Sequence, residues 1–281
     1  MSDLHPVRTL ALTLLALTAS ACGGTSGPTT PGPVPPGPVT PEQPAPTAPT
    51  PHTVKGVVLN ESGAPVENAD IIVEPAMFRG TVFTTTNAAG TYQSIALPAQ
   101  ANPYFVYAYK KLTYHGKPYC VRMAGEGHAY QDAFNATPGV IRNFRWKLTG
   151  ASDMPADSNG SGHWGASLAF DNTSTEDDMF VDWDARIEVT LLPDGPLIDG
   201  SEGRPLTLTT TMAAGLQDIP AGYYRLTAAL IRDDGSRAPL QVSTSNLESR
   251  LAGSTALLFN GYETCGHAGT FQKTFVWLAR Q

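Results

Sequence analysis

The residues that could carry chemistry in this chain of 281 residues are few and scattered. The densest group of carboxylates lies in the segment FDNTSTEDDMFVDWD, which holds Asp171, Glu176, Asp177, Asp178, Asp182 and Asp184. Several oxygen ligands in one loop suit calcium, but the ordered ligand spacing of an EF-hand loop is absent. A solvated acidic loop is therefore the favoured interpretation, with calcium as the alternative.

Histidine and nucleophile chemistry has equally little support. Glu126 and His128 could form an acid–base pair, and Cys265 with His267 could supply half of a metal site. No His-x-His, His-Glu-x-x-His or paired Cys-x-x-Cys spacing occurs, and neither Gly-x-Ser-x-Gly nor Ser-x-x-Lys is present. We therefore expect no catalytic residue, no metal site and no cofactor, and we do not expect an enzyme.

Aromatic side chains are better candidates for ligand binding. In the run YFVYAY, strand alternation places Phe105, Tyr107 and Tyr109 on one face. A row of exposed rings can stack on a sugar, because each ring presents a rigid flat surface. The candidate set for ligand binding is Phe105, Tyr107, Tyr109, Tyr114, Trp164 and Trp183. The favoured alternative is that these rings fill the cores and the junction between two domains.

The elements that would position these side chains begin after an export signal. Residues 1–21 comprise a short polar start, a leucine-rich apolar run and a stretch of small residues before Cys22, which together predict a signal peptide. The box Ala19-Ser20-Ala21-Cys22 resembles a bacterial lipoprotein signal, and that resemblance implies a diacylated Cys22 as the first mature residue. The alternative is ordinary cleavage that leaves Cys22 as a free thiol.

Cysteine counting supports the lipid anchor. The chain has three cysteines, and lipid on Cys22 leaves Cys120 and Cys265 as an even pair in an oxidising compartment, where a disulfide persists. We expect that pair to join two domains, although the sequence does not show that the two residues meet.

Residues 22–51 form a linker rich in Pro, Gly, Ser and Thr. This composition cannot bury a core and favours extended polyproline chain, which at about 3.1 Å per residue reaches roughly 90 Å. We expect a stalk that holds a folded head away from a membrane; the alternative is a disordered terminus. The net charge of −7 and the scattered basic residues argue against nucleic acid as a partner.

Residues 52–149 read as a first β-sandwich. Short β-branched runs alternate with turn clusters, and helical periodicity is nearly absent. The motifs GVVLNESGAPVENADIIV and TTTNAAGTYQSIALP resemble the carboxypeptidase regulatory-like, or transthyretin-like, domain. Matching positions are Gly63, Pro65, Val66, Ala69, Thr85, Thr86, Asn87, Gly90 and Tyr92. The resemblance implies an accessory module without catalytic residues, related to carbohydrate-binding folds, in which Tyr92 caps the sandwich with its ring inside.

Residues 150–281 read as a second, immunoglobulin-like β-sandwich. Turn signals at 193–195 and 233–235 separate apolar runs, and Ser245 to Glu248 matches a capping box that predicts one short helix ending near Gly253. The fold class expected for the whole chain is all-β, with two sandwich domains after the signal peptide and the disordered linker.

Three hypotheses for the function follow from these features. The first is a non-enzymatic cell-envelope lipoprotein, an accessory scaffolding or protein-binding module lipid-anchored on the extracytoplasmic side of the cell membrane or outer membrane. The second is a lipoprotein that binds an envelope polysaccharide through the ring set. The third, which we disfavour, is a hydrolase or metal enzyme. The sequence leaves the partner, the membrane and the oligomeric state open.

Overall fold

The structure, a computed structural model, describes residues 48–154, 162–173, 176, 178–266 and 271–281. In this part of the chain the only helices are two short 3-10 turns, and strands form several sheets, which confirms the all-β prediction. The expected signal peptide, Cys22 and the linker as far as residue 47 lie outside the described residues. No helix within the described ranges has the length and hydropathy needed to span a membrane.

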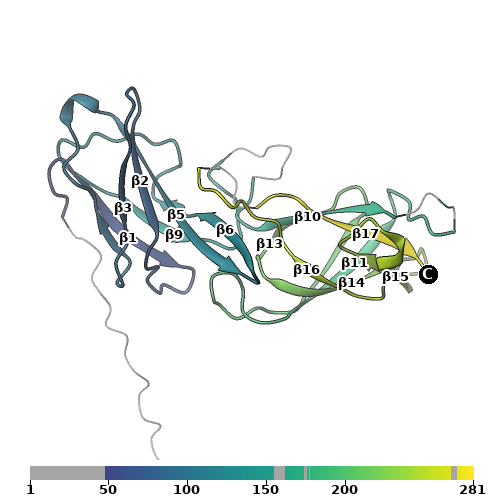
Figure 1. Cartoon of the computed structure of the whole chain (residues 1–281). Coiled ribbons are helices and arrows are strands. Elements are labelled where there is room, and N and C mark those ends of the chain that lie inside the picture. The colour runs from purple at the N-terminus through teal and green to yellow at the C-terminus, as the bar shows by residue number, and fades with distance from the viewer. Residues whose placement is uncertain (1–47, 155–161, 174–175, 177, 267–270) are drawn as a thin grey trace, which may run out of the picture. The chain divides into compact units, whose positions relative to one another are not determined.

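The first nine strands form the N-terminal lobe, which contains two sheets (Figure 1). One sheet has the order β4-β1-β9-β7, with β8 also paired to β1. Its members are β1 (Val54–Asn60), β4 (Thr91–Gln93), β7 (Ala124–Glu126), β8 (Val140–Ile141) and β9 (Asn143–Trp146). The other sheet has the order β3-β2-β5-β6. Its members are β2 (Asp70–Pro75), β3 (Val82–Thr85), β5 (Tyr104–Tyr114) and β6 (Lys117–Arg122).

Strand alternation explains how this lobe forms its core. Ile71, Val73, Val106 and Ala108 occupy alternate positions of β2 and β5 and are each at most 4% exposed. Burial of such side chains contributes roughly 1.5–3 kcal/mol for each large aliphatic group, before the entropy cost of ordering the chain. The alternate residues between them face outward, so one face of the β3-β2-β5-β6 sheet is left for other contacts.

In the N-terminal lobe, two glycines of the motif lie in turns and the expected burial of the Tyr92 ring is confirmed. Gly63 and Gly90 have positive φ angles of 83° and 70°, a conformation that glycine adopts in turns without a Cβ penalty. The Tyr92 ring is buried, and its hydroxyl donates a hydrogen bond of 2.6 Å to the carbonyl oxygen of Arg142. Tyr92 therefore caps the sandwich as expected.

The remaining eight strands form the C-terminal lobe. They follow the order β12-β11-β14-β15-β17-β10-β13, with β16 also paired to β14. Strand β15 pairs with β14 through its first residues and with β17 through its last four, so one strand passes between two layers. The strands are β10 (Ala166–Asn172), β11 (Arg186–Pro193), β12 (Leu206–Thr211), β13 (Leu216–Ile219), β14 (Tyr223–Ile231), β15 (Arg237–Ser243), β16 (Thr255–Leu258) and β17 (Thr274–Arg280).

The helix predicted between Ser245 and Gly253 is wrong. Only a 3-10 turn, η2 (Glu248–Arg250), forms there, and its N-cap Leu247 makes no side-chain capping bond. The Ser245 hydroxyl instead accepts a bond of 3.4 Å from the Leu247 amide. Ala252 then pairs with Val242 in a β-bridge, so the backbone returns to the sheet before a full helical turn can form.

Contacts from the β5–β6 hairpin join the two lobes. The Tyr119 hydroxyl donates to the carbonyl of Phe259 at 2.8 Å, and the Cys120 amide donates to the carbonyl of Tyr262 at 2.6 Å. Cys120 and Cys265 form a disulfide with their Cα atoms 5.2 Å apart, which confirms the predicted pairing. The joint is therefore covalent as well as hydrogen-bonded.

Candidate binding surface

The outer face of the β3-β2-β5-β6 sheet carries a row of apolar side chains. Ile72 lies opposite Phe83 on β3 and opposite Tyr107 on β5, so these three residues form one cross-strand row. Phe83 is 70% exposed, and Ile72 and Tyr107 are partly buried. Met77 and Phe78, at the end of the β2–β3 hairpin, are also exposed. Exposed apolar side chains gathered on one surface mark contact sites more often than single scattered ones.

Two further rings extend this row on β5 and on the loop after β7. Phe105 stacks on Tyr107 with centroids 6.3 Å apart and an interplanar angle of 18°. Tyr130 also lies against Tyr107, with ring centroids 4.5 Å apart. Burial, together with the neighbouring Tyr130 and Glu74, raises the pKa of Tyr107 to about 12, so its hydroxyl is a neutral donor at physiological pH. We name Ile72, Phe83, Phe105, Tyr107 and Tyr130 the aromatic face.

Two residues of the predicted ring set, Tyr109 and Trp164, are buried, which agrees with the favoured alternative of core packing and rules them out as ligand-binding residues. Tyr109 shares the face of Phe105 and Tyr107 as predicted, but it is 1% exposed, and Trp164 is 2% exposed. Arg122 is the cross-strand neighbour of Tyr109, and its guanidinium lies 4.4 Å from the Trp164 ring centroid. The same guanidinium lies 4.8 Å from Tyr130 and pairs with Asp153. This buried cluster covers the β6 side of the face, so neither ring can stack on a ligand.

Tyr114 and Trp183 have different environments. The Tyr114 hydroxyl donates to the carbonyl of Pro196 at 2.7 Å and accepts from the Tyr223 amide at 2.9 Å, so it joins the lobes. Trp183 is 48% exposed and lines a shallow pocket of about 160 Å³ in the C-terminal lobe. The structure therefore brings only Phe105 and Tyr107 of the predicted set together on one open surface.

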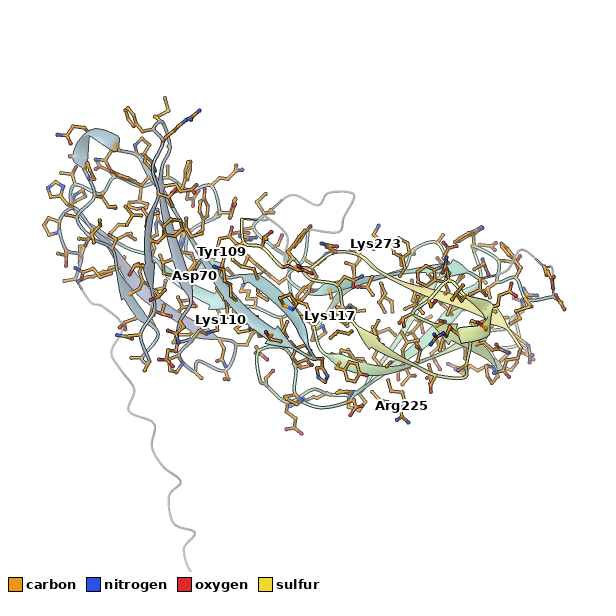
Figure 2. All side chains as sticks on the ribbon, viewed as in Figure 1. Asp70, Tyr109, Lys110, Lys117, Arg225 and Lys273 are labelled. Atoms are coloured by element: carbon orange, nitrogen blue, oxygen red, sulfur yellow. A yellow bond between two sulfur atoms is a disulfide. The ribbon has the colours of Figure 1, made fainter. Side chains whose placement is uncertain are left out.

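Polar groups at the edge of the aromatic face are held in place (Figure 2). Lys111 forms an ion pair of 2.9 Å with Asp70 on the side of Tyr107, whereas Lys110 alternates to the other side of β5, where its ammonium donates to the carbonyl of Glu67 at 2.6 Å. Since Lys111 is well exposed, this pair adds little stability. The ion pair instead places charged groups beside the apolar surface.

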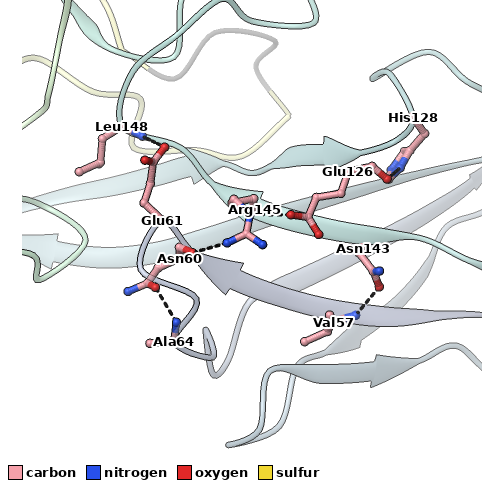
Figure 3. A network of polar contacts seen from close by, with 9 residues as sticks. All are labelled: Val57, Asn60, Glu61, Ala64, Glu126, His128, Asn143, Arg145 and Leu148. Atoms are coloured by element: carbon pink, nitrogen blue, oxygen red, sulfur yellow. Dashed lines mark hydrogen bonds and ion pairs between the residues drawn. The ribbon is translucent and has the colours of Figure 1, made fainter. Parts of the chain in front are cut away.

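The suggested acid–base pair of Glu126 and His128 does not form (Figure 3). The Glu126 carboxylate pairs with Arg145, and the Arg145 guanidinium also donates to the carbonyl of Asn60 at 2.8 Å. His128 contacts Glu126 only through the backbone carbonyl, at 3.2 Å from Nδ1. Burial lowers the pKa of His128. The carboxylate is therefore committed to a structural ion pair.

The acidic segment does not form a metal site in the described residues. Asp182 pairs with Arg280 at 2.7 Å, and Asp171 accepts from the Asn172 amide. Within those ranges, no group of three or more His, Cys, Asp or Glu side chains could hold a metal ion. Asp177 and His267 lie outside the described residues.

The sequence reasoning missed three residues of the aromatic face, Ile72, Phe83 and Tyr130. In TVFTTT, strand alternation places Val82 and Phe83 on opposite faces. Both faces also carry threonine, so the pattern does not indicate which face is buried. Tyr130 lies in a loop, where alternation gives no information. A pairing of Phe83 and Tyr107 across Ile72 depends on strand register, which the sequence does not contain.

Comparison with known proteins assigns the chain to no family. No family model and no curated protein matches the chain. The shaft pilin SpaA of Lactobacillus rhamnosus GG aligns over 83% of this chain and 99% of its own, with 12% identity and a TM-score of 0.21. The pilus adhesin SpaC of the same organism aligns over 80% of this chain and 28% of its own, with 11% identity and a TM-score of 0.22. Likenesses this distant carry no argument about function, and the resemblance to carboxypeptidase regulatory-like domains stays a prediction.

Proposed function

We propose that this chain is a non-enzymatic lipoprotein of the bacterial cell envelope, an accessory module that binds or scaffolds another envelope component. The observation that carries the proposal is the aromatic face, because Phe83, Ile72 and Tyr107 form a continuous row on a sheet that nothing in the described residues covers at β3. Burial of apolar area against a partner contributes roughly 25 cal/mol per Å² before the costs of association. Such a face suits binding without catalysis.

The placement outside the cytoplasm rests on the cysteines. The disulfide between Cys120 and Cys265 leaves Cys22 as the odd cysteine, at the position where the lipoprotein resemblance places a diacyl anchor. Disulfides persist in oxidising compartments. Together these features support an exported head that a lipid holds at the cell membrane or outer membrane, displayed on the proline-rich stalk.

The first prediction concerns this anchor. Replacing Cys22 by Ala removes the acylation site, so the protein should move from the membrane fraction to the soluble extracytoplasmic fraction. Immunoblotting of fractionated cells measures the shift, and mass spectrometry of the mature N-terminus measures the acyl chains. Unmodified Cys22 in the wild type would contradict the anchor and leave the binding proposal intact.

The second prediction concerns the aromatic face. Phe83→Asp together with Phe105→Asp places two charges on the contact surface, so cross-linking of the protein to its envelope partner should fall by about tenfold or more. Ile95→Asp is the matched control, because Ile95 is also 70% exposed in the N-terminal lobe but lies outside the aromatic face. Equal cross-linking of both variants would contradict the proposal.

A second candidate function is polysaccharide binding by the same surface. The observation that favours it is the nearly parallel pair of Phe105 and Tyr107, whose rings differ by 18° in orientation. Retention of the protein on envelope polysaccharide, lost in Phe105→Ala, would select this candidate over a protein partner. Carbohydrate stacking needs flat rings and a polar edge; both residues supply a ring, and the Tyr107 hydroxyl supplies the polar group.

A further inference from the structure

The C-terminal lobe contains a groove between strands β16 and β17, away from the aromatic face. The first residues of β14 pair with β16, whereas its last residues pair with β15, which continues onto the end of β17. The segments that carry β16 and β17 approach each other where Gly261 bridges Phe271 and Gln272 donates to the carbonyl of Asn260. Past that point they diverge, and a groove of about 300 Å³ opens between them.

Aromatic rings form both walls of the groove. Alternation on β17 buries Thr274, Val276 and Leu278 and turns Phe275 and Trp277 outward, with ring centroids 6.1 Å apart. Phe275 is 44% exposed. Tyr223 forms the opposite wall, and its ring is held by stacking on His115 at 4.2 Å. The two rings are tilted by 33° to each other, so they present two adjacent apolar surfaces along one strand.

Polar residues complete the lining at both ends. Asn260 lies beside Thr274, and Thr244 follows Ser243, which is the register partner of Trp277. A larger hollow of about 610 Å³ adjoins it, shares Lys117 and Asn260, and adds the amide of Gln272. Amides and hydroxyls donate and accept hydrogen bonds, so they match ligands that carry many hydroxyl groups. The continuity of the two hollows suits a ligand several units long.

The charge of the groove is opposite to that of the whole chain. The net charge is −7, yet Lys117 is the one charged side chain among the described residues that line the smaller groove. Arg225 is exposed on β14 directly opposite Ala256, another lining residue, so a second cation lies beside the groove. Both cations are labelled in Figure 2. Glu263 lines the adjoining hollow together with Lys117, so the excess of positive charge belongs to the smaller groove and not to the adjoining hollow.

We propose that this groove binds an acidic polysaccharide, with sugar rings stacked on Phe275 and Trp277 and a uronate carboxylate at Lys117. The rings supply flat apolar contact, Asn260 and Thr244 supply hydrogen bonds, and the ammonium supplies the charge selectivity. Lys117 comes from the β5–β6 hairpin of the N-terminal lobe, so both lobes contribute to the site. This proposal does not depend on the aromatic face.

Isothermal titration calorimetry on the full mature chain in mild detergent tests the proposal. The probes are a hexamer of galacturonic acid, a hexamer of galactose as the neutral match, and hexaglutamate as an acidic peptide. The galacturonate hexamer should bind at least about tenfold more tightly than either of the other two probes, and its affinity should fall with added salt. Equal affinity for the galactose hexamer, stronger binding of hexaglutamate, or no binding of the galacturonate hexamer would overturn the proposal.

Groove variants paired with control variants distinguish a direct role of the groove residues in binding from a loss of binding caused by misfolding. Lys117→Gln and Trp277→Ala should each weaken galacturonate binding by about tenfold, and Lys117→Gln should also remove most of the salt dependence. Arg232→Gln and Ile95→Ser, which change an exposed cation and an exposed apolar side chain outside both surfaces, should leave the affinity unchanged. Circular dichroism confirms that each variant is folded. Wild-type affinity in both groove variants would overturn the assignment, whereas loss of cross-linking in the Phe83 and Phe105 variant would not affect it.

Discussion

At the scale of single residues, burial decides which of the ionisable groups respond to pH. His128 packs edge-on against Phe144 with centroids 5.1 Å apart, and its Nε2 is buried without a hydrogen-bond partner within the described residues. Burial lowers the pKa of this imidazole, and the bond to the Glu126 carbonyl opposes that shift. The folded protein therefore holds His128 in its neutral form, which loses least on leaving water.

This burial predicts a pH dependence of stability. The unfolded chain, with an ordinary histidine pKa near 6.5, binds a proton more readily than the folded chain, so the free energy of unfolding should decrease as pH falls below that value. The contribution of neutral His128 to stability is fully present above pH 6.5. It is lost progressively as the pH falls from 6.5 to the lowered pKa of the folded state. Between pH 7 and pH 5, the free energy of unfolding of His128→Phe, measured by urea denaturation, should decrease less than that of the wild type. An equal decrease in both proteins would contradict this account.

At the scale of elements, the β5–β6 hairpin is longer than its apolar pattern indicates. The alternating run of rings ends at Tyr109, but β5 continues to Tyr114. His115 and Gly116 have positive φ angles of 46° and 78°, as in the two-residue turns that match strand twist. The additional length carries Tyr114 to its contacts with the C-terminal lobe and Lys117 to the groove. Sheet pairing with β6 supports residues that would otherwise be assigned to a loop.

Removal of one hydroxyl tests the role of this hairpin. Tyr114→Phe loses the bond to the Pro196 carbonyl and leaves the Tyr223 amide without its acceptor. Because both bonds are partly exposed, the free energy of unfolding should fall by about 1 kcal/mol, at the low end for a lost acceptor. Thr113→Val, which changes an exposed residue next to it, is the control. An unchanged midpoint in guanidinium chloride for Tyr114→Phe would show that the hairpin contact is not stabilising.

At the scale of the whole molecule, the disulfide and the close packing beside it hold the two lobes together. The bridge joins residues 145 positions apart. Next to it, a Cβ atom added to Gly261 would lie 2.1 Å from the Tyr119 ring, so only glycine fits there without a shift of that ring. The groove needs Lys117 from one lobe and rings from the other, and a fixed joint keeps them together.

Loss of the bridge should therefore be costly. In the chain-entropy model, closing a loop of this length stabilises the folded state by about 5 kcal/mol, and native disulfides typically contribute 2–5 kcal/mol. Cys120→Ser with Cys265→Ser should lower the free energy of unfolding by about this amount in guanidinium denaturation. Wild type measured with a reducing agent should match the double variant. Equal stability of the oxidised wild type and the double variant would contradict the role of the bridge.

Local patterns predicted much of the fold and little of the site. The alternation of short apolar runs with turn clusters and the capping role of Tyr92 depend on residues close together in the chain, and both are found in the structure. The capping box at Ser245 failed, because a bridge between Val242 and Ala252 outweighs a local preference for helix. Tertiary pairing overrides propensity where the propensity is weak.

The sequence by itself determined that the described chain is built of strands and that Phe105, Tyr107 and Tyr109 share a face, whereas the pairing of Cys120 with Cys265 is visible only in the structure. Only the tertiary structure decided that Tyr109 is covered while Phe83 and Tyr107 lie in one open row, and that Lys117 meets the rings of β17. The physical reason is the distance along the chain over which each interaction acts. Alternation and turn chemistry act between neighbours in the chain, whereas exposure depends on strand register and on side chains such as Arg122 and Trp164 that arrive from distant segments.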